Sequence, residues 1–290
     1  VETGDANAYY RMGVIEYNLE NDDKALEYFN KAIELNPDHH NAHYYLGIIN
    51  FARDNLEEAE KELDAAVSVK DEFANAWYWK GRVNLRQMET DQGVSDLQKA
   101  TSIDDQLTDA WYYLGGVLGD SGNYQEAVAA FEKVTDQRPE FADAFYFKGL
   151  DQYQLELIDE AKDSLEQALQ LNSSTFTPDL QANAWYLMGM VQTADDNIQE
   201  ASRSFNESVA LNASSSVAWN ALGTALNELE DYDGALQAFE QAVTLDDSIS
   251  ESWYNIGNVQ RNLNQTEDAL TSYGKAIAID PQPRVYNSKG

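Results

Sequence analysis

The stretch TDAWYYLGGVLGDSGNYQEAVAAFEKVTDQRPEF, residues 108–141, contains one full period of the pattern that decides the fold. An aromatic residue, Trp111, stands four positions before Gly115. A turn signal, Asp120–Asn123, follows the glycine and separates it from Phe131. Small and bulky apolar residues recur at spacings of three and four on both sides of this turn, which places them on one face of a helix. The stretch therefore predicts two antiparallel helices joined by a short turn.

The same pattern recurs along almost the whole chain. Its glycine returns every 34 residues, with one longer step of 40, at Gly13, Gly47, Gly81, Gly115, Gly149, Gly189, Gly223 and Gly257. A fixed period of this length is typical of a solenoid, in which each repeat packs on its neighbours. The small residues let the two helices of a repeat approach closely, and the bulky residues fill the space between repeats. We expect eight helix pairs, beginning at residues 6, 40, 74, 108, 142, 182, 216 and 250.

The recurring aromatic, glycine, small and bulky positions together resemble the tetratricopeptide repeat (TPR). This resemblance implies an all-α fold, a right-handed superhelical solenoid of antiparallel helix pairs, here as one continuous domain over residues 1–290. It also implies that the first helices line a concave groove through the second, fifth, ninth, twelfth and thirteenth positions of each repeat. One departure is His43, which replaces the aromatic residue of the second repeat.

Two features interrupt the regular array. An insertion near residues 172–181 lengthens the step between the fifth and sixth repeats, and we interpret it either as a longer surface loop or as a hinge or docking loop. Residues 285–290 resemble the beginning of a ninth repeat. The chain is then a piece of a longer array, a subunit whose ends stack on other copies, or an array whose tail covers its last helix.

Polar and aromatic residues at the predicted groove positions are the candidate binding residues. Those at the second position would hold the backbone of an extended peptide or cap their helices, and they are Asn7, Asn41, Asn75, Asp109, Asp143 and Asn183. Those at the fifth position would contact a partner or pack between repeats, and they are Tyr10, Tyr44, Tyr78, Tyr112, Tyr146, Tyr186 and Tyr254. Arg82 and Arg86 lie four residues apart on one predicted helix, where they would bind a partner's carboxylate or pair with acids of their own chain.

Charge narrows the classes of partner. The chain has 51 acidic and 19 basic residues, a net charge of −32 at neutral pH. Nucleic acid and anionic membrane surfaces carry the same sign, so we expect neither as a partner. No apolar run reaches the roughly 20 residues that a membrane-spanning helix needs. The charge instead favours a basic protein or peptide, or serves to keep the outer helices solvated.

Catalytic and metal-binding patterns are sparse. The chain has no cysteine and shows neither a glycine-rich phosphate loop nor a nucleophile motif, so we expect no enzyme and no resident cofactor. His39, His40 and His43 are close enough together to bind a transition metal, but His43 also occupies a packing position. Acid pairs in predicted turns, such as Asp22 and Asp23, leave Ca²⁺ as a weak alternative, because no complete calcium-loop spacing accompanies them.

Four Asn-x-Ser/Thr sequons make glycosylation a further hypothesis. They begin at Asn172, Asn206, Asn212 and Asn264, and three of them fall in predicted turns, where a glycan would fit. The sequons and the low lysine content favour an extracellular or cell-surface location slightly over a cytoplasmic one. The sequence itself does not fix the compartment.

Two functional hypotheses follow from these patterns. The first is a non-catalytic scaffold whose groove mediates protein–protein interaction with a basic peptide or protein. The second is a structural subunit that stacks head to tail with further copies into a helical filament, outside the cell and glycosylated. The scaffold hypothesis predicts that a partner binds in the groove, whereas the filament hypothesis predicts that copies of the chain bind one another at their ends.

Overall fold

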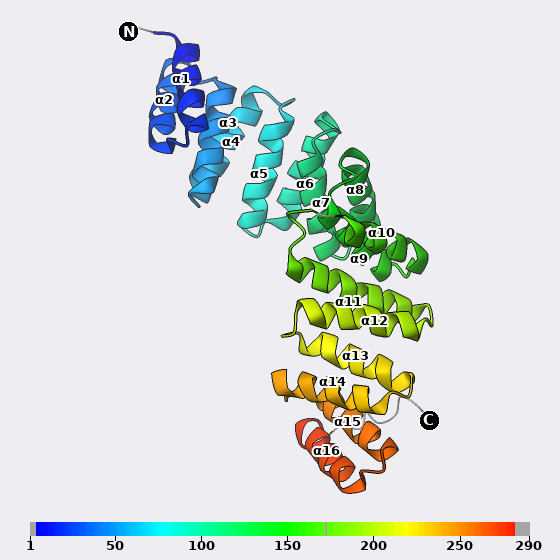
Figure 1. Cartoon of the computed structure of the whole chain (residues 1–290). Helices are drawn as coiled ribbons and strands as arrows, with labels where there is room; N and C mark the ends of the chain where they lie inside the picture. The colour runs from blue at the N-terminus through cyan, green and yellow to red at the C-terminus, as the bar shows by residue number, and fades with distance from the viewer. Residues whose placement is uncertain (1–3, 172, 282–290) are drawn as a thin grey trace. The chain divides into compact units, whose positions relative to one another are not determined.

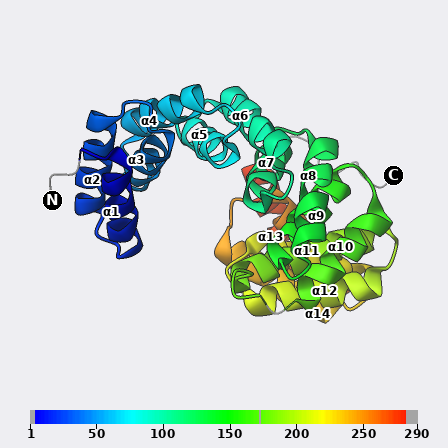
Figure 2. The same cartoon turned by 90° about the horizontal axis from the view of Figure 1, so that it is seen from above.

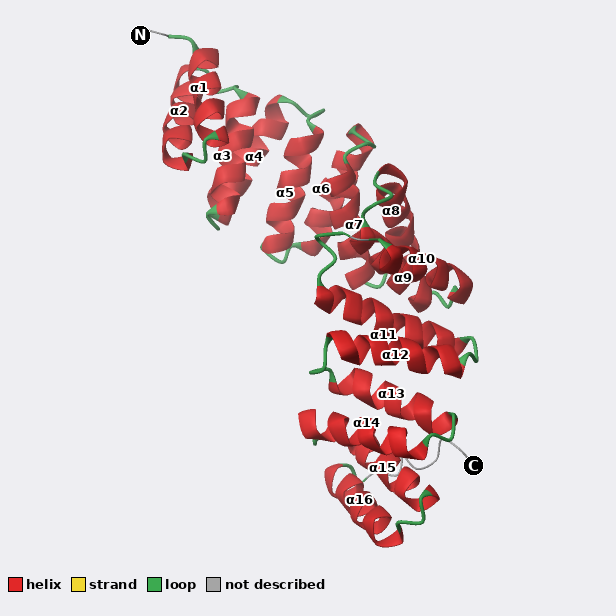
Figure 3. Cartoon of the chain, in the orientation of Figure 1, coloured by secondary structure: helices red, strands yellow, loops and turns green. Residues whose placement is uncertain are grey.

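The computed structural model describes residues 4–171 and 173–281, and within them every regular element is an α-helix (Figures 1 and 3). The sixteen helices of these residues follow one another as eight antiparallel pairs. The helices group into two compact units, Val1–Pro139 and Glu140–Gly290, which we call the N-terminal half and the C-terminal half. That all repeats form one continuous superhelical array stays a prediction.

The N-terminal half contains four helix pairs. Its helices are α1 (Ala6–Asn18), α2 (Asp22–Leu35), α3 (His40–Ala52), α4 (Leu56–Val69), α5 (Ala74–Arg86), α6 (Thr90–Ile103), α7 (Thr108–Asp120) and α8 (Tyr124–Gln137). Each second helix packs on its own first helix, and α2, α4 and α6 also pack on the first helix of the next repeat, as α4 packs on α3 and α5. Figure 2 shows α3 and α5 following one another along one side of this half, with α4 and α6 along the other.

The C-terminal half is built in the same way. Its helices are α9 (Ala142–Gln154), α10 (Ile158–Gln170), α11 (Pro178–Ala194), α12 (Ile198–Leu211), α13 (Ser216–Glu228), α14 (Tyr232–Leu245), α15 (Ser250–Asn262) and α16 (Thr266–Ile279). First helices of successive repeats also touch each other, α9 with α11 and α13 with α15. The first helices therefore form one layer of this half, and the second helices form the other.

The repeating glycine is where the two helices of a pair come closest. In α7, a methyl group added at Gly115 would lie 2.9 Å from the ring of Phe131 on α8. Phe131 itself is buried, with 1 % of its surface exposed. A glycine at this position lets a bulky ring of the second helix lie directly against the backbone of the first, as close packing requires.

A recurring tryptophan ties four of the first helices, α5, α7, α13 and α15, to the turn before them. The indole nitrogen of Trp111 donates to the carbonyl oxygen of Asp105, six residues earlier, at 3.0 Å. Trp77 makes the same bond to Asp71 at 2.7 Å. Trp219 and Trp253 repeat it at 2.9 and 3.0 Å. The aromatic position thus supplies a hydrogen-bond donor as well as a packing surface.

The turn within each pair is a left-handed helix cap. One residue between the two helices has a positive φ, at Glu20, Asp54, Met88, Gly122, Glu156, Asp196, Glu230 and Asn264. The following amide then bonds back to a carbonyl five residues earlier, as Asn55 does to Asn50 at 2.9 Å. This arrangement satisfies the free carbonyl groups at the end of the first helix and reverses the chain.

The insertion after the fifth repeat is a packed segment. Phe176 is buried with 2 % exposure and belongs to the core cluster of α9, α10 and α11. The hydroxyl of Thr175 donates to the carboxylate of Asp143 at 2.9 Å. Thr177 caps α11, which begins at Pro178, four residues before the predicted start of its repeat at Ala182. The described part of the insertion therefore adds core and a further helical turn.

Candidate functional site

The predicted tyrosine row lies largely within the packing between helices. Four of its rings lie 5.8–6.1 Å from the bulky aromatic residue of their own second helix, in the pairs Tyr10–Phe29, Tyr112–Phe131, Tyr186–Phe205 and Tyr254–Tyr273. Tyr78 and Tyr146 are buried. Burial raises the pKa of both Tyr44 and Tyr78 to about 12. The geometry favours the packing interpretation of this row.

The polar residues of the second position have varied environments. Asn7, Asn75, Asp109 and Asn183 are exposed, Asn41 is half-buried, and Asp143 is buried against the insertion. None of them is an N-cap, because the capping residue lies one position before each helix, as Asp5 and Ser215 do. Asp109 pairs with Arg138 at 3.1 Å, whereas Asn7, Asn75 and Asn183 remain exposed to a partner.

Arg82 is surrounded by aromatic rings from three first helices. Its guanidinium carbon lies 4.4 Å from the ring centroid of Trp79, 4.6 Å from Tyr113 and 4.9 Å from Phe51. It also donates to the hydroxyl of Tyr78 at 3.3 Å. Cation–π contacts of this kind hold a guanidinium by its faces. We call these five residues the Arg82 cluster.

Arg86 behaves differently from Arg82. It forms an exposed ion pair with Asp54 at 3.3 Å. Among the residues that the structure describes, no carboxylate oxygen lies within 4 Å of the Arg82 nitrogens. The predicted pairing with the chain's own acids therefore describes Arg86, whereas Arg82 is held by aromatic rings.

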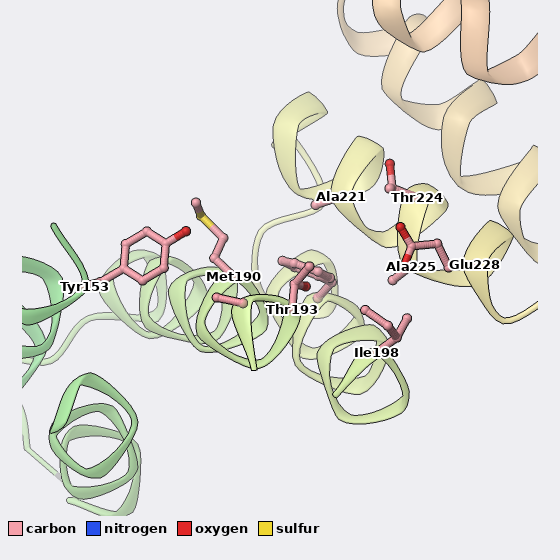
Figure 4. Close-up of a pocket in the computed structure, with 10 residues that line it drawn as sticks. Tyr153, Met190, Thr193, Ile198, Ala221, Thr224, Ala225 and Glu228 are labelled. Carbon is pink, nitrogen blue, oxygen red and sulfur yellow. The ribbon is translucent and has the colours of Figure 1, made fainter. Parts of the chain in front are cut away.

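A pocket of about 320 Å³ opens in the C-terminal half. Figure 4 shows it between Tyr153 of α9, Met190 and Thr193 of α11, and Ala221 and Glu228 of α13. Its other lining residues are mainly apolar, and they are Ala194, Ile198, Phe205, Thr224 and Ala225. It thus lies where three successive first helices meet the second helix α12.

Electrostatically, the pocket carries one charge. The hydroxyl of Thr193 donates to the carbonyl of Gly189 at 2.8 Å, and that of Thr224 donates to Asn220 at 3.0 Å. Both hydroxyl protons are therefore engaged within their own helices. Glu228 is the one charged residue among those that line the pocket. The site combines an apolar interior with a carboxylate.

None of these pocket residues was among the predicted site residues, although a signal for them exists. Met190 and Thr193 occupy the ninth and twelfth positions of their repeat, and Thr224 and Glu228 occupy the ninth and thirteenth of the next. These are groove positions that the TPR resemblance implies. The sequence prediction singled out tyrosines, amides and arginines instead, and so passed over small and apolar residues.

The sequons and the acidic turns have the following places. Asn206 is exposed within α12, and Asn264 is exposed in a left-handed turn. Asn212 follows α12 and accepts two hydrogen bonds from Ser214. Asn172 and the predicted ninth repeat at residues 285–290 lie outside the described residues. Across residues 4–171 and 173–281, no group of three or more histidine or acidic residues is arranged to hold a metal ion.

No helix within the described ranges has both the length and the apolar character that crossing a bilayer requires.

Family models match most of the repeats that the structure shows. Three models, each described as tetratricopeptide repeat, match residues 6–39 and 250–283, residues 112–174 and 186–250, and residues 28–61. The chain belongs to the tetratricopeptide repeat family. No curated protein matches its sequence.

Solved TPR structures share the fold. YrrB, described as a TPR protein with an unusual peptide-binding site, is 23 % identical, with a TM-score of 0.58 over 65 % of this chain and 94 % of its own. PilF of Pseudomonas aeruginosa is 20 % identical, with a TM-score of 0.61 over 74 % and 96 %. The C-terminal part of a TPR protein from Cytophaga hutchinsonii is 15 % identical, with a TM-score of 0.66 over 85 % and 100 %. At these identities the similarity establishes the architecture and leaves the ligand open.

Proposed function

We propose that this TPR chain is a non-catalytic scaffold that holds a segment of another protein against its first helices. TPR proteins as a class are interaction scaffolds, and YrrB is described as having a peptide-binding site. The observation that carries the proposal is the pocket of the C-terminal half, because six of its ten lining residues occupy groove positions of three successive repeats.

The size and lining of the pocket fit a peptide side chain. Its volume of about 320 Å³ is at the lower end of the range for ligand sites. The apolar walls would gain free energy by removing an aliphatic side chain from water. Met190 adds an adaptable thioether that follows the shape of its contact. The bound segment would then run along the exposed first-helix surface of this half, with the exposed amide of Asn183 as a further contact.

The test is a selection of twelve-residue peptides from a random library on the purified full chain, followed by affinity measurement. Filling the pocket with Thr193→Trp is expected to weaken binding of the selected peptides at least tenfold. Thr244→Trp is the matched control, since Thr244 is an exposed threonine on α14 that also donates to the carbonyl four residues earlier. Equal binding by both variants, or no selected peptide at all, would contradict the proposal.

Self-association is the second candidate, and the exposed apolar residues of the first and last described helices favour it. Met12 and Ile15 of α1 are 40 % and 58 % exposed, and Leu270 and Ile277 of α16 are 62 % and 52 % exposed. Further copies could cover such faces head to tail and build a filament. The exposed Asn206 and Asn264 would leave room for glycans on such an assembly. Light scattering across protein concentration tests this model, which predicts oligomers that Ile277→Glu with Ile279→Glu abolishes.

A further inference from the structure

We propose that the pocket is a specificity site for an aliphatic side chain that neighbours a lysine or arginine, with Glu228 as the group that recognises the basic residue. This inference rests on the proposed function and names the chemistry of its ligand.

Glu228 lies at the edge of the pocket, where a cation bound beside the apolar interior would contact its carboxylate. It is the last residue of α13 and lines the pocket together with Thr224 and Ala225, which lie one turn earlier. An acidic residue at a helix C-terminus is unfavourable for its own helix, because the free carbonyls there already carry partial negative charge. The carboxylate of Glu228 and the free carbonyl groups at the end of α13 therefore make this edge of the pocket, which we call the rim, negatively charged.

No cation of the surrounding chain neutralises this rim. The residues 140–281 contain 24 acidic and 5 basic residues, a net charge of 5 − 24 = −19. Arg203 is already paired with Glu200 at 2.6 Å, and Lys275 lies over the ring of Trp253 at 3.7 Å. None of the five basic residues lines the pocket. Within the described residues, Glu228 has no ion-pair partner of its own.

The rim charge acts at short range. At physiological ionic strength, exposed charges more than about 8 Å apart are largely screened. The overall acidity of the half will speed the approach of any basic partner, but it distinguishes poorly between basic partners. Discrimination has to come from a group in contact with the ligand. Glu228 is that group, because an aliphatic side chain in the pocket brings its sequence neighbours to the rim.

Peptide specificity tests the inference on the full chain. Peptides selected from the twelve-residue library should share an aliphatic residue followed or preceded by lysine or arginine. Replacing that basic residue by glutamine should weaken binding several-fold. Glu228→Lys should weaken binding of the basic peptide about five- to tenfold, since it removes one exposed ion pair and adds a like-charge contact. It should also improve binding of the peptide in which the basic residue is glutamate.

The matched control is Glu230→Lys, which changes the same charge two residues away, in the exposed turn after α13 and outside the pocket lining. If the two charge reversals have equal effects, long-range attraction alone is at work and the inference is wrong. If selected peptides bind, Thr193→Trp blocks them, and no basic residue is shared, the scaffold proposal stands and this inference falls. Binding that Thr193→Trp leaves intact contradicts the scaffold proposal itself.

Discussion

The Nδ1 atom of His43 lies 2.6 Å from the Oε2 atom of Glu62, and both side chains are buried. On the other edge of the ring, Nε2 lies 2.8 Å from the carbonyl oxygen of Pro37, six residues earlier. This second bond is the one that Trp77 and Trp111 make to their preceding turns. A histidine in place of the aromatic residue thus keeps the donor to the turn and acquires a carboxylate partner on the other side.

This arrangement predicts a loss of stability in the pH window above 6.5. The hydrogen bond that His43 donates to the Glu62 carboxylate raises the pKa of His43 above its usual 6.5. The stability that this hydrogen bond contributes is therefore fully present below pH 6.5, and it is lost as the pH rises through the folded-state pKa of His43. We expect the free energy of unfolding to fall by roughly 1–2 kcal/mol across this window, as for a hydrogen bond to a charged group. Urea unfolding at several pH values measures it.

His43→Trp is the control for this pH dependence. It restores the usual donor and removes the titrating group, so the decline above pH 6.5 should disappear. Burial lowers the pKa of His39 and His40, which places their effect below pH 6.5, outside the window. An undiminished decline in His43→Trp would show that another group is responsible.

Two adjacent glycines of α7 should respond oppositely to alanine. A methyl group at Gly115 would lie 2.9 Å from the Phe131 ring, whereas one at Gly116 meets no atom within 4 Å. Gly115→Ala should destabilise the protein by about 1–3 kcal/mol through overpacking. Gly116→Ala should stabilise it by up to about 1 kcal/mol, because alanine favours the helix. Urea midpoints of the two variants compare these effects, and similar midpoints would contradict the close approach of α7 and α8.

The contrast between these glycines shows how much of the fold the sequence predicts. Periodicity alone separates Gly115, which recurs, from Gly116, which does not, and so predicts the helix pair and its contact face. The turn after α7 was equally readable from Asp120–Asn123. These features are local or strictly repeated, and each repeat packs in the same way on the next.

The candidate site was less predictable, for a physical reason. Residue type says that Tyr78 can contact a partner, but the next repeat decides how much of its ring stays exposed. The pocket depends on small residues such as Ala221 and Ala225 on one helix facing Met190 on another. The pocket exists because small side chains on neighbouring helices leave a space between them. No single stretch of sequence shows that these side chains face one another.

The Arg82 cluster predicts unequal effects for two neighbouring arginines. Arg82→Ala removes a guanidinium that lies 4.4 Å from the ring of Trp79, and it should cost about 1–2 kcal/mol of stability. Arg86→Ala removes only an exposed ion pair with Asp54, and it should cost less than about 0.5 kcal/mol. Arg82→Lys should recover part of the loss, since lysine keeps the charge without the planar stacking. Urea unfolding followed by tryptophan fluorescence measures all three variants.

The insertion gives the last prediction, because a loose surface loop and a packed segment differ in what their side chains do. A loose surface loop would tolerate loss of any side chain within about 0.5 kcal/mol. Phe176, however, is 2 % exposed, and the side-chain Nε2 of Gln181 donates to the backbone carbonyl of Phe176 at 2.8 Å. We therefore expect Phe176→Ala to destabilise the C-terminal half by about 3–5 kcal/mol, while Ser174→Ala, at an exposed position, changes little. Thr175→Val should cost about 1 kcal/mol by removing the bond to buried Asp143.

Urea unfolding of the three variants measures these differences. Equal stability of Phe176→Ala and Ser174→Ala would show that the insertion is a loose surface loop. The expected order would show that the insertion belongs to the core and fixes the start of α11, the helix that forms one wall of the pocket.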